Sequence, residues 1–430
     1  MMRPYTEYQQ SDISWLGKVP KHWTKNKFKF LLNEKPKTQN LELPCGSISF
    51  GHVVFKDSER LSEETKAAYQ EVLSGEFLIN PLNLNYDLKS LRTALADIDV
   101  IVSSGYIVLK SLGVVDKAYL RWLLYLFDVR HMKTLGAGIR QTISFKDIAD
   151  CAVYIPNDSE QKAIATFLDR ETQRIDSLIE EKQTFIKLLK EKRQALISHV
   201  VTKGLNSNVE MLDSGIEWIG QVPKHWIVRR LKHTSTLQSG IAKGKDNAGK
   251  ETLSIPMLRV ANVQDGYVKL DDVHEINVLP HEVERYALKD GDVLMNEGGD
   301  NDKLGRGTVW KEQIKPCIHQ NHVFVIRVTD IEPEWLGWLT QSAYAKFYFF
   351  RVSKQSTNLA SISSTNVKEV HLLIPPTDER KLIMEYLEKQ TSKLKLLVQD
   401  VEESITLLKE HRTSLISAAV TGKIDVREAV

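Results

Sequence analysis

Two loops of the chain carry side chains of the kinds that bind nucleic acids. Each loop follows a short apolar run that ends in asparagine, at Asn80 in the first half and at Asn296 in the second. Lysine and arginine can approach phosphates or guanine edges, and asparagine can pair with adenine. The candidate DNA-binding residues of the two loops are Asn83, Asn85, Lys89, Arg92, Asn301, Lys303 and Arg306. Such residues are also common in solvated turns, so composition alone leaves both interpretations open.

A second basic stretch precedes each of these loop regions. Its candidate DNA-binding residues are Lys25, Lys27, Lys29, Arg229, Arg230 and Lys232. They lie at the entrance to two regions of dissimilar sequence, where phosphate contact and a merely solvated rim are both open. Four tryptophans accompany them, namely Trp15, Trp23, Trp218 and Trp226. We predict that these tryptophans pack as a clamp at the start of each unit rather than stack on bases.

No residue pattern for catalysis is found in the sequence. It lacks a GxxxxGK[ST] phosphate loop, a GxSxG turn, an HExxH motif and any Cys/His cluster with metal-site spacing. Residues 80–83 resemble the Asn-Pro-Pro-aromatic motif of amino-methyltransferases only faintly, because Leu82 and Asn83 break it. The three cysteines are far apart and are expected to be buried thiols. We therefore predict no catalytic residue, no metal site and no cofactor in this chain.

The composition is that of an ordinary soluble globular protein. Of 430 residues, 42% are hydrophobic and 27% are charged, and the formal net charge is +2. No apolar run is long enough to span a bilayer, and the N-terminus lacks the apolar core of a signal peptide. We therefore expect a cytoplasmic protein without membrane contact. The net charge does not decide on a nucleic-acid partner, because a basic face can coexist with acidic residues elsewhere.

The elements that must position the candidate residues are duplicated. Residues 11–29 and 214–232 share ten identities in nineteen aligned positions, including the motif WxGxVPKHW. Residues 155–204 align with residues 374–423, and the region between the two matches is 16 residues longer in the second copy. The chain therefore consists of two units in which similar ends flank dissimilar middles.

Each copy ends in a predicted long amphipathic helix. From Asp158 to Thr202 the sequence contains neither proline nor glycine, and apolar residues recur with heptad spacing. The predicted seam, which would also serve in partner docking, consists of Ile164, Leu168, Ile175, Leu178, Phe185, Leu189, Leu196, Ile383, Leu387, Leu394, Leu397, Leu408 and Leu415. Asp158 and Thr377 are candidate N-caps, and Gly204 and Gly422 are candidate C-terminal stops. A helix of about 44 residues is roughly 65 Å long, which favours antiparallel pairing of the two copies over packing of each on its own domain.

The middle regions are predicted to be compact α/β domains, because they mix short strand-like runs with turns. Residues 75–80 align with residues 291–296, so both domains should share a scaffold that carries different loops. We expect an α/β fold with internal duplication and pseudo-two-fold symmetry, in which two long antiparallel coiled-coil helices separate the two domains. The predicted boundaries are 1–155 for the first domain, 156–205 for the first helix, 206–373 for the second domain, and 374–430 for the second helix with a C-terminal tail.

The order of these blocks resembles the DNA specificity subunit of type I restriction-modification systems. The resemblance covers essentially the whole chain and rests on WxGxVPKHW before each domain, the Ile-Pro entry to each long helix, and the segment GDVLMNEGGDNDKLGRG. It implies that both α/β domains are target-recognition domains. Each would read one half of a bipartite double-stranded DNA target, and the helices would set the gap between the halves. The first domain departs from the pattern, because it has no GGDNDKLGRG loop.

The same resemblance implies the partners. The helices would dock two modification (methyltransferase) subunits, and motor-nuclease restriction subunits would join them. S-adenosylmethionine, ATP and Mg²⁺ would then act in those subunits. Two alternatives are weighed against this hypothesis. A duplicated scaffold that joins protein partners would show no salt-dependent DNA binding. A self-sufficient restriction-modification polypeptide would need methyl-donor and nuclease motifs, for which the assigned segments leave no room.

Overall fold

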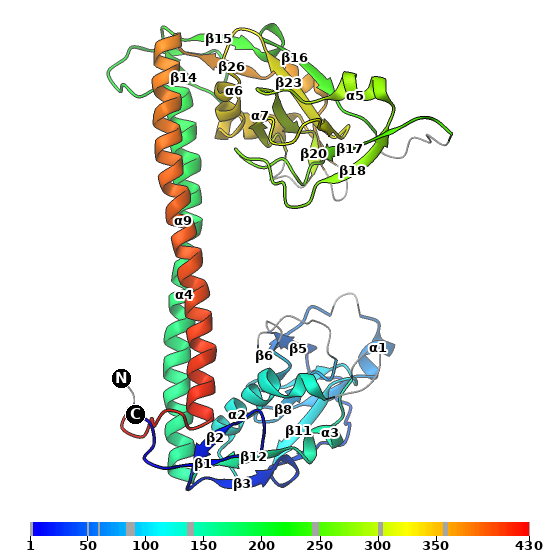
Figure 1. Ribbon diagram of the computed structural model, residues 1–430, viewed down its shortest axis with the longest axis vertical. Helices are drawn as coiled ribbons and strands as arrows, with labels where there is room; N and C mark the ends of the chain where they lie inside the picture. The colour runs from blue at the N-terminus through cyan, green and yellow to red at the C-terminus, as the bar shows by residue number, and fades with distance from the viewer. Residues whose placement is uncertain are drawn as a thin grey trace. The chain divides into compact units, whose positions relative to one another are not determined.

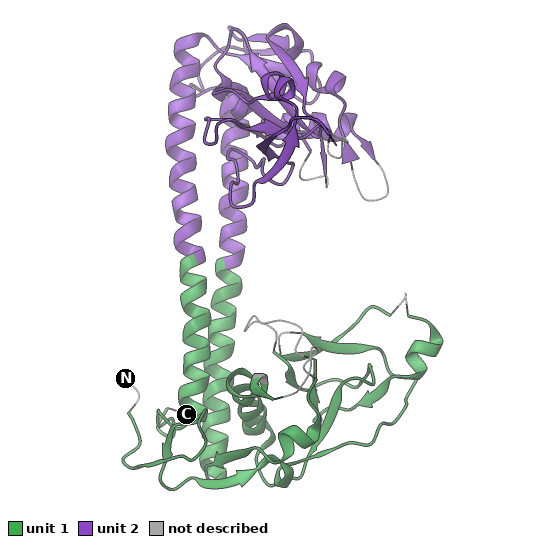
Figure 2. Ribbon diagram, turned by 45° about the vertical axis from the view of Figure 1, so that its right-hand side comes forward, with its two compact units in different colours: residues 1–182, 403–430 green, residues 183–402 purple. Residues whose placement is uncertain are grey.

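The protein divides into two compact units, each with one α/β domain. The computed structural model describes residues 3–49, 51–58, 61–82, 91–135, 142–242, 249–299, 304–355 and 360–429. Unit 1 consists of residues 1–182 and 403–430, and unit 2 consists of residues 183–402 (Figure 2). The two long helices, α4 (Asp158–Lys203) and α9 (Thr377–Val420), each contribute one part to unit 1 and the other part to unit 2. The expected duplication is therefore present in the fold.

The domain of unit 1 is built on a six-stranded sheet (Figure 1). In spatial order its strands are β4 (Leu32–Glu34), β11 (Ile107–Ser111), β8 (Phe77–Ile79), β9 (Thr93–Leu95), β6 (His52–Phe55) and β5 (Gly46–Ser49). Neighbours are antiparallel except β6 and β9, which run parallel. Helix α2 (Lys117–Arg130) packs against the sheet through buried apolar side chains such as Tyr119 and Phe127. The smaller elements are η1 (Phe28–Phe30), α1 (Glu63–Ala67), β7 (Gln70–Val72), β10 (Val100–Val102), η2 (Met132–Thr134) and α3 (Phe145–Ala149).

The domain of unit 2 combines three small sheets. The first contains β16 (Ser235–Ser239), β23 (Val323–Val328), β19 (Val293–Asn296) and β21 (Gly307–Val309); the second contains β18 (His274–Val278), β17 (Leu253–Leu258) and β22 (Ile318–His319); the third contains β20 (Gly298–Gly299), β25 (Ala360–Ser361) and β24 (Lys354–Gln355). The remaining elements are η3 (Leu231–His233), α5 (Pro280–Tyr286), α6 (Pro333–Thr340), α7 (Ala343–Val352) and α8 (Ser364–Lys368). Trp335 of α6 lies fully buried in the core beside Val293 and Ile326. In this domain α6 follows β23, as α2 follows β11 in unit 1.

Two antiparallel strand pairs recur in both units. The pairs are β1 (Tyr8–Gln10) with β2 (Lys18–Pro20), β13 (Met211–Asp213) with β14 (Gln221–Pro223), β3 (Thr24–Lys27) with β12 (Ala152–Ile155), and β15 (Ile227–Arg230) with β26 (His371–Ile374). The first pair of each unit carries the repeated tryptophan motif. The second pair forms a neck, because it brings the first strand of a domain beside its last strand. The repeated motif therefore builds the same local structure twice.

The ends of the long helices differ slightly from the expected caps. Helix α4 starts at Asp158, but it is the side chain of Asn157 that accepts the backbone N–H of Glu160, at 3.0 Å. The predicted N-cap Asp158 is thus the first helical residue, as is Thr377 in α9. Gly204 and Gly422 follow the C-terminal ends with φ of 76° and 71°. This left-handed conformation confirms both as helix stops, because it costs glycine little.

Within each unit the two helix segments run antiparallel. In unit 1, Ile164 and Leu168 share a buried core with Ile416 and Val420, and Arg412 bonds to Asp176 at 2.9 and 3.1 Å. In unit 2, the residue pair 197 and 200 of α4 shares a core with the pair 383 and 387 of α9. Residue numbers therefore rise along one helix as they fall along the other, so the helices are antiparallel, as the sequence predicts.

The seam follows a different phase from the predicted one in the middle of each helix. Ile164, Leu168, Ile175, Leu189, Ile383, Leu387 and Leu394 are buried, and Leu196, Leu408 and Leu415 are half-buried. By contrast, Leu178, Phe185 and Leu397 are 37%, 46% and 45% exposed. The half-buried positions are one residue later, at Ile179, Ile186 and Val398. The assignment of those three exposed residues to the seam is therefore wrong.

Two buried threonines also belong to the seam, although the apolar pattern does not include them. Thr172 and Thr391 occupy equivalent positions, and their hydroxyls donate to the carbonyls of Leu168 and Leu387 at 2.6 and 2.8 Å. This bond within the helix satisfies the hydroxyl, so the threonine can take a core position. Each threonine therefore fills a seam position that the apolar pattern omits, four residues after Leu168 or Leu387 and three before Ile175 or Leu394.

Candidate functional site

The two candidate loops occupy the same place in the two domains. In unit 1 the loop leaves β8 and returns in β9, and the N–H of Asn80 donates to the carbonyl of Arg92 at 2.8 Å. In unit 2 the loop leaves β19 and returns in β21, and the N–H of Asn296 donates to the carbonyl of Arg306 at 2.9 Å. Both are therefore hairpin loops closed by an asparagine and an arginine. The candidates Asn83, Asn85, Lys89, Asn301 and Lys303 lie outside the described residues.

Arg92 is held inside the first domain and not on its surface. It is 5% exposed, and its Nε donates to Oδ1 of Asp128 at 2.8 Å. The backbone N–H of Arg92 donates to Oδ2 of the same carboxylate at 2.6 Å. Moving the guanidinium away from this buried carboxylate would be costly, because the acid would lose its partner. In this structure Arg92 stabilises the point where the chain returns into β9, and its contact with DNA stays a prediction.

Arg306 has a comparable position in the second domain. Its Nη1 donates to Oε1 of Gln264 at 2.9 Å, and its Nε lies 4.0 Å from a carboxylate oxygen of Asp265. The side chain of Asn296, which closes the same hairpin, is buried and donates to two backbone carbonyls at 3.1 and 3.2 Å. These contacts fix both ends of the hairpin loop. Contact of Arg306 with DNA stays a prediction.

The basic stretch after each tryptophan motif is balanced by nearby acids. Lys25 pairs with Asp12, Lys27 and Lys29 with Asp150, Arg229 with Asp330, and Arg230 and Lys232 with Glu369. Hydrogen bonds from Lys29 and Lys27 hold the pKa of the Asp150 carboxyl below its ordinary value, and Lys232 does the same for Glu369. Exposed pairs of this kind add little to stability but reduce the local field. The stretch therefore offers less attraction to phosphate than its sequence suggests.

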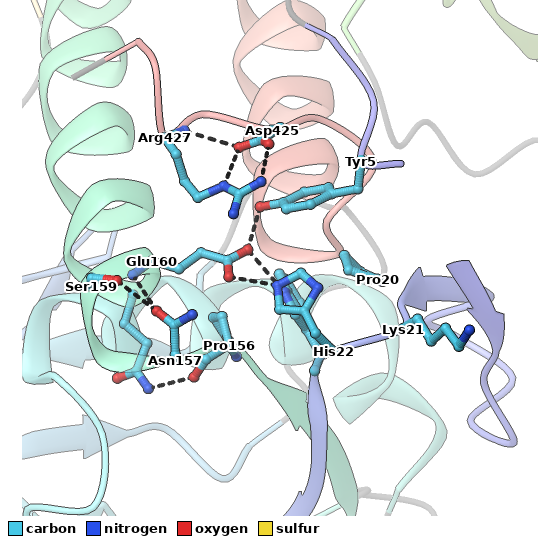
Figure 3. Close-up of polar contacts among 12 residues, drawn as sticks. Tyr5, Pro20, Lys21, His22, Pro156, Asn157, Ser159, Glu160, Asp425 and Arg427 are labelled. Atoms are coloured by element: carbon cyan, nitrogen blue, oxygen red, sulfur yellow. Dashed lines mark hydrogen bonds and ion pairs between the residues drawn. The ribbon is translucent and has the colours of Figure 1, made fainter. Parts of the chain in front are cut away.

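The tryptophan motif of unit 1 forms a clamp around one carboxylate, as Figure 3 shows. Glu160, in the first turn of α4, has a fully buried side chain. Its Oε1 accepts the indole N–H of Trp23 at 2.9 Å and the hydroxyl of Tyr5, and its Oε2 lies 2.9 Å from Nε2 of His22. Burial and the bond to Glu160 raise the pKa of the Tyr5 phenol. We call these four residues the first clamp.

The first clamp also receives the end of α9. A Cβ atom on Gly422 would overlap Pro20 and lie 3.1 Å from the Trp23 ring, so the glycine is packed directly against the motif. The hydroxyl of Tyr8 donates to the Gly422 carbonyl at 3.0 Å. Within unit 1, one motif thus holds the start of one long helix and the end of the other.

Unit 2 contains a second clamp, which consists of His225, Trp226 and Glu379. Nε2 of His225 lies 2.7 Å from Glu379 Oε2, and the Trp226 indole N–H donates to the carboxylate at 3.2 Å. A Cβ atom on Gly204 would lie 3.3 Å from the Trp226 ring, so the end of α4 is received as Gly422 is in unit 1. Burial of Trp23 and Trp226 confirms the packing role predicted for them. Their glutamate partners were missed, although both stand at the third position of their helices.

Each unit also contains a groove between its domain and its helix segments. The grooves have volumes of about 600 Å³ in unit 2 and about 480 Å³ in unit 1. Equivalent residues line them: Asp169, Thr172, Arg412 and Trp122 in unit 1, and Glu388, Thr391, Arg193 and Trp338 in unit 2. A surface repeated in this way can accept the same molecule twice.

Neither a metal centre nor a membrane helix is found in the described part of the chain. No three His, Cys, Asp or Glu side chains there are grouped so that they could hold a metal ion. No helix among the same residues is long and apolar enough to cross a bilayer.

Comparison with known proteins agrees with this architecture. Residues 84–188 match the family model of the type I restriction modification DNA specificity domain. The specificity subunit of the type I restriction enzyme EcoKI from Escherichia coli K12 is 24% identical over 276 residues, which cover 63% of this chain and 57% of that subunit. The match thus spans just over half the length of this curated relative.

Two solved structures share the fold over nearly the whole chain. One, from a study of complex assembly and conformational transition of the type I R-M system, has a TM-score of 0.66 at 14% identity and covers 94% of this chain and 98% of its own. The other is the HsdS subunit from Thermoanaerobacter tengcongensis, with a TM-score of 0.50, 15% identity and the same coverage. These matches agree with the resemblance: residues 84–188 match the type I restriction modification DNA specificity domain, and the chain is similar to the specificity subunits of these systems.

Proposed function

We propose that the chain is the DNA specificity subunit of a type I restriction-modification complex and has no catalytic role of its own. Each α/β domain would read one half of a bipartite target in double-stranded DNA. The observation that carries this proposal is the repetition of one hairpin scaffold with unlike loops, in which Asn80 and Arg92 correspond to Asn296 and Arg306. Equal scaffolds with unequal loops suit two half-sites of different sequence.

Flanking elements support a reading surface around each hairpin loop. In unit 1 the turn between β5 and β6 touches the loop exit, because a Cβ on Gly51 would lie 2.9 Å from Leu91. In unit 2 the strands β24 and β25 pair beside β20, and the exposed Lys354 lies opposite Ser361, which also pairs with Gly298. Since two weak contacts on one duplex reinforce each other, neither domain alone would need to bind tightly.

Partner docking is supported by apolar residues that both helices leave exposed. Leu178 and Leu397 are equivalent in the two copies, and so are Leu188 and Leu407; all four are exposed. Unit 1 contains Leu178 and Leu407, and unit 2 contains Leu397 and Leu188. The same apolar pattern and the same groove thus occur once in each unit. This favours docking of two copies of one partner, the modification subunit, with restriction subunits joining afterwards.

The cofactors of the reaction would belong to those partners. The modification subunits would bind S-adenosylmethionine, and the restriction subunits would use ATP and Mg²⁺. The role left for this chain is to position the complex on its target, within the cytoplasm where the DNA lies.

Sequencing of methylated bases in the host genome, with and without the gene, tests the proposal. We expect one bipartite motif, two short sequences separated by a fixed gap, to lose its methylation when the gene is deleted. Unchanged methylation would contradict the proposal. A protein scaffold that does not touch DNA would give that result, and the purified complex would then also show no salt-dependent binding to DNA.

A pull-down of the modification subunit tests the docking surface. Leu178→Ser and Leu397→Ser should weaken capture of the modification subunit while leaving thermal unfolding unchanged, because both side chains are already exposed. The matched control is Thr184→Ala, on an exposed polar position of the same helix. Normal capture by the double leucine variant would place the docking surface elsewhere.

A further inference from the structure

The two clamps occupy the points where the recognition domains join the long helices. In unit 1, His22 and Trp23 directly precede β3, and Glu160 follows β12 by five residues. Since β3 and β12 form the neck of the domain, the carboxylate ties that neck to the first turn of α4. In unit 2, His225, Trp226 and Glu379 have the same relation to β15 and β26.

We propose that Glu160 and Glu379 are positioning residues that fix the angle of each recognition domain on the helices, and thereby the gap at which the two half-sites are read. The inference rests on the proposed function, because a gap exists only if the target is bipartite. The carboxylates would touch neither DNA nor a substrate. They act through Trp23 and Trp226, which carry the chain into the first strand of each domain.

The geometry favours a positioning role over a general role in folding. The domain of unit 1 is also attached to the helices by a large apolar core, in which Ile164 and Leu168 meet Leu120 and Phe127. Helix α2 adds a hydrogen bond from the Trp122 indole to Asp169 at 2.8 Å. These contacts would hold the domain on the helices without the clamp. The carboxylate adds a fixed orientation of the domain relative to the helix, because it accepts hydrogen bonds from two or three rings that meet at fixed angles.

The experiment is methylome sequencing of strains whose complex contains Glu379→Ala or Glu160→Ala. We expect both half-site sequences to be kept, while methylation at sites with a gap one base pair longer or shorter rises about tenfold, the factor that one charged hydrogen bond provides. A loss of stability alone would lower methylation at every site and leave the gap unchanged. An unchanged gap in a variant that still methylates would overturn the inference.

Matched variants keep the test decisive. Asp158→Ala and Asp378→Ala remove exposed acids from the same helix turns outside the clamps and should leave the gap as it is. Glu160→Gln and Glu379→Gln keep one oxygen acceptor for the tryptophan and should restore most of the original gap preference. If Glu160→Ala yields no soluble complex, the more exposed Glu379→Ala and His225→Ala carry the test. A wild-type complex without any bipartite motif would refute the proposed function, and not the clamp.

Discussion

The two clamps have the same arrangement of residues but differ in how deeply the glutamate is buried and in how many partners it has. The side chain of Glu160 is 0% exposed and has three partners, whereas that of Glu379 is 27% exposed and has two. The third partner in unit 1 is Tyr5, from the N-terminal segment of the chain. The guanidinium of Arg427, from the C-terminal tail, lies 5.2 Å from the Tyr5 ring and pairs with Asp425.

The difference lies in the segments that meet at each clamp. In unit 2 the polypeptide continues from Gly204 into β13, so the end of α4 is linked covalently to the next motif. In unit 1 the segment after α9 contacts the N-terminal segment, for example through the bond from the Asp425 N–H to the Arg3 carbonyl at 2.8 Å. The comparison teaches that the same motif can bury its glutamate to different degrees, depending on the segments that pack around it.

Removal of the two clamp carboxylates should reveal the largest difference between the units. Glu160→Ala leaves the buried donors of Tyr5 and Trp23 without an acceptor, at about 1–3 kcal/mol for each. Glu379→Ala exposes its donors to water more readily and should cost about 1 kcal/mol. Hydrogen exchange, followed peptide by peptide, should show faster exchange in unit 1 for the first variant and a smaller change in unit 2 for the second. Equal effects in the two units would mean that the deeper burial of Glu160 and its third partner add no stability to unit 1.

Lowering the pH should destabilise unit 2 more than unit 1, because unit 2 buries His319. Burial lowers the pKa of His319 to about 4, while the unfolded chain keeps a value near 6.5. Between pH 6.5 and pH 4 the unfolded chain therefore binds a proton that the folded unit does not, and unit 2 loses stability as the pH falls through this window. In unit 1, burial lowers the pKa of His131 as well, but that ring is only half-buried. The depressed pKa of Asp425 acts below this range.

Unfolding of the protein at pH 7 and at pH 5 measures this effect. His319→Asn keeps a donor for the Val323 carbonyl, which lies 2.7 Å from Nδ1, and should flatten the pH dependence of unit 2. A variant that remains as sensitive to acid as the wild type would assign the titration to another group.

The smallest expected difference concerns the two helix-end glycines. Gly204→Ala and Gly422→Ala share the strain of a left-handed backbone, about 1–2 kcal/mol. At Gly422 the new methyl group also meets the rigid Pro20 ring, whereas at Gly204 its nearest neighbour is a carboxylate oxygen of Glu379 at 3.1 Å, which can move. Gly422→Ala should therefore lose about 1–3 kcal/mol more in denaturant unfolding. Identical losses would show that backbone strain is the whole effect.

The parts of the fold that depend on local sequence were predictable. The helix ends at Gly204 and Gly422 follow from local sequence, and the duplication and the equivalence of residues 75–80 with 291–296 follow from direct alignment of short segments. In both domains the aligned segment forms a central strand that leads into a hairpin loop. Short-range chemistry, such as glycine at a left-handed position, is sufficient for these conclusions.

What escaped prediction depends on partners that are distant in sequence or polar. Arg92 reads as a surface cation until Asp128 is placed beside it by the fold. Thr172 reads as a solvent-facing residue, although its own helix satisfies its hydroxyl. Glu160 resembles any acid in a first helical turn, and its role needs Trp23, which lies 137 residues away. Composition and periodicity carry no information about such pairings.

The neck of each domain has a consequence for how such proteins can change. Because β3 pairs with β12 and β15 with β26, each domain begins and ends at neighbouring points, and everything between them forms a closed insertion. Another α/β domain could replace that insertion, provided that it starts and finishes in two paired strands and offers the helices an apolar face like that of Leu120 and Phe127. If the proposed function holds, whole domains could then be exchanged as units, and recombination on each side of a neck would supply a new target.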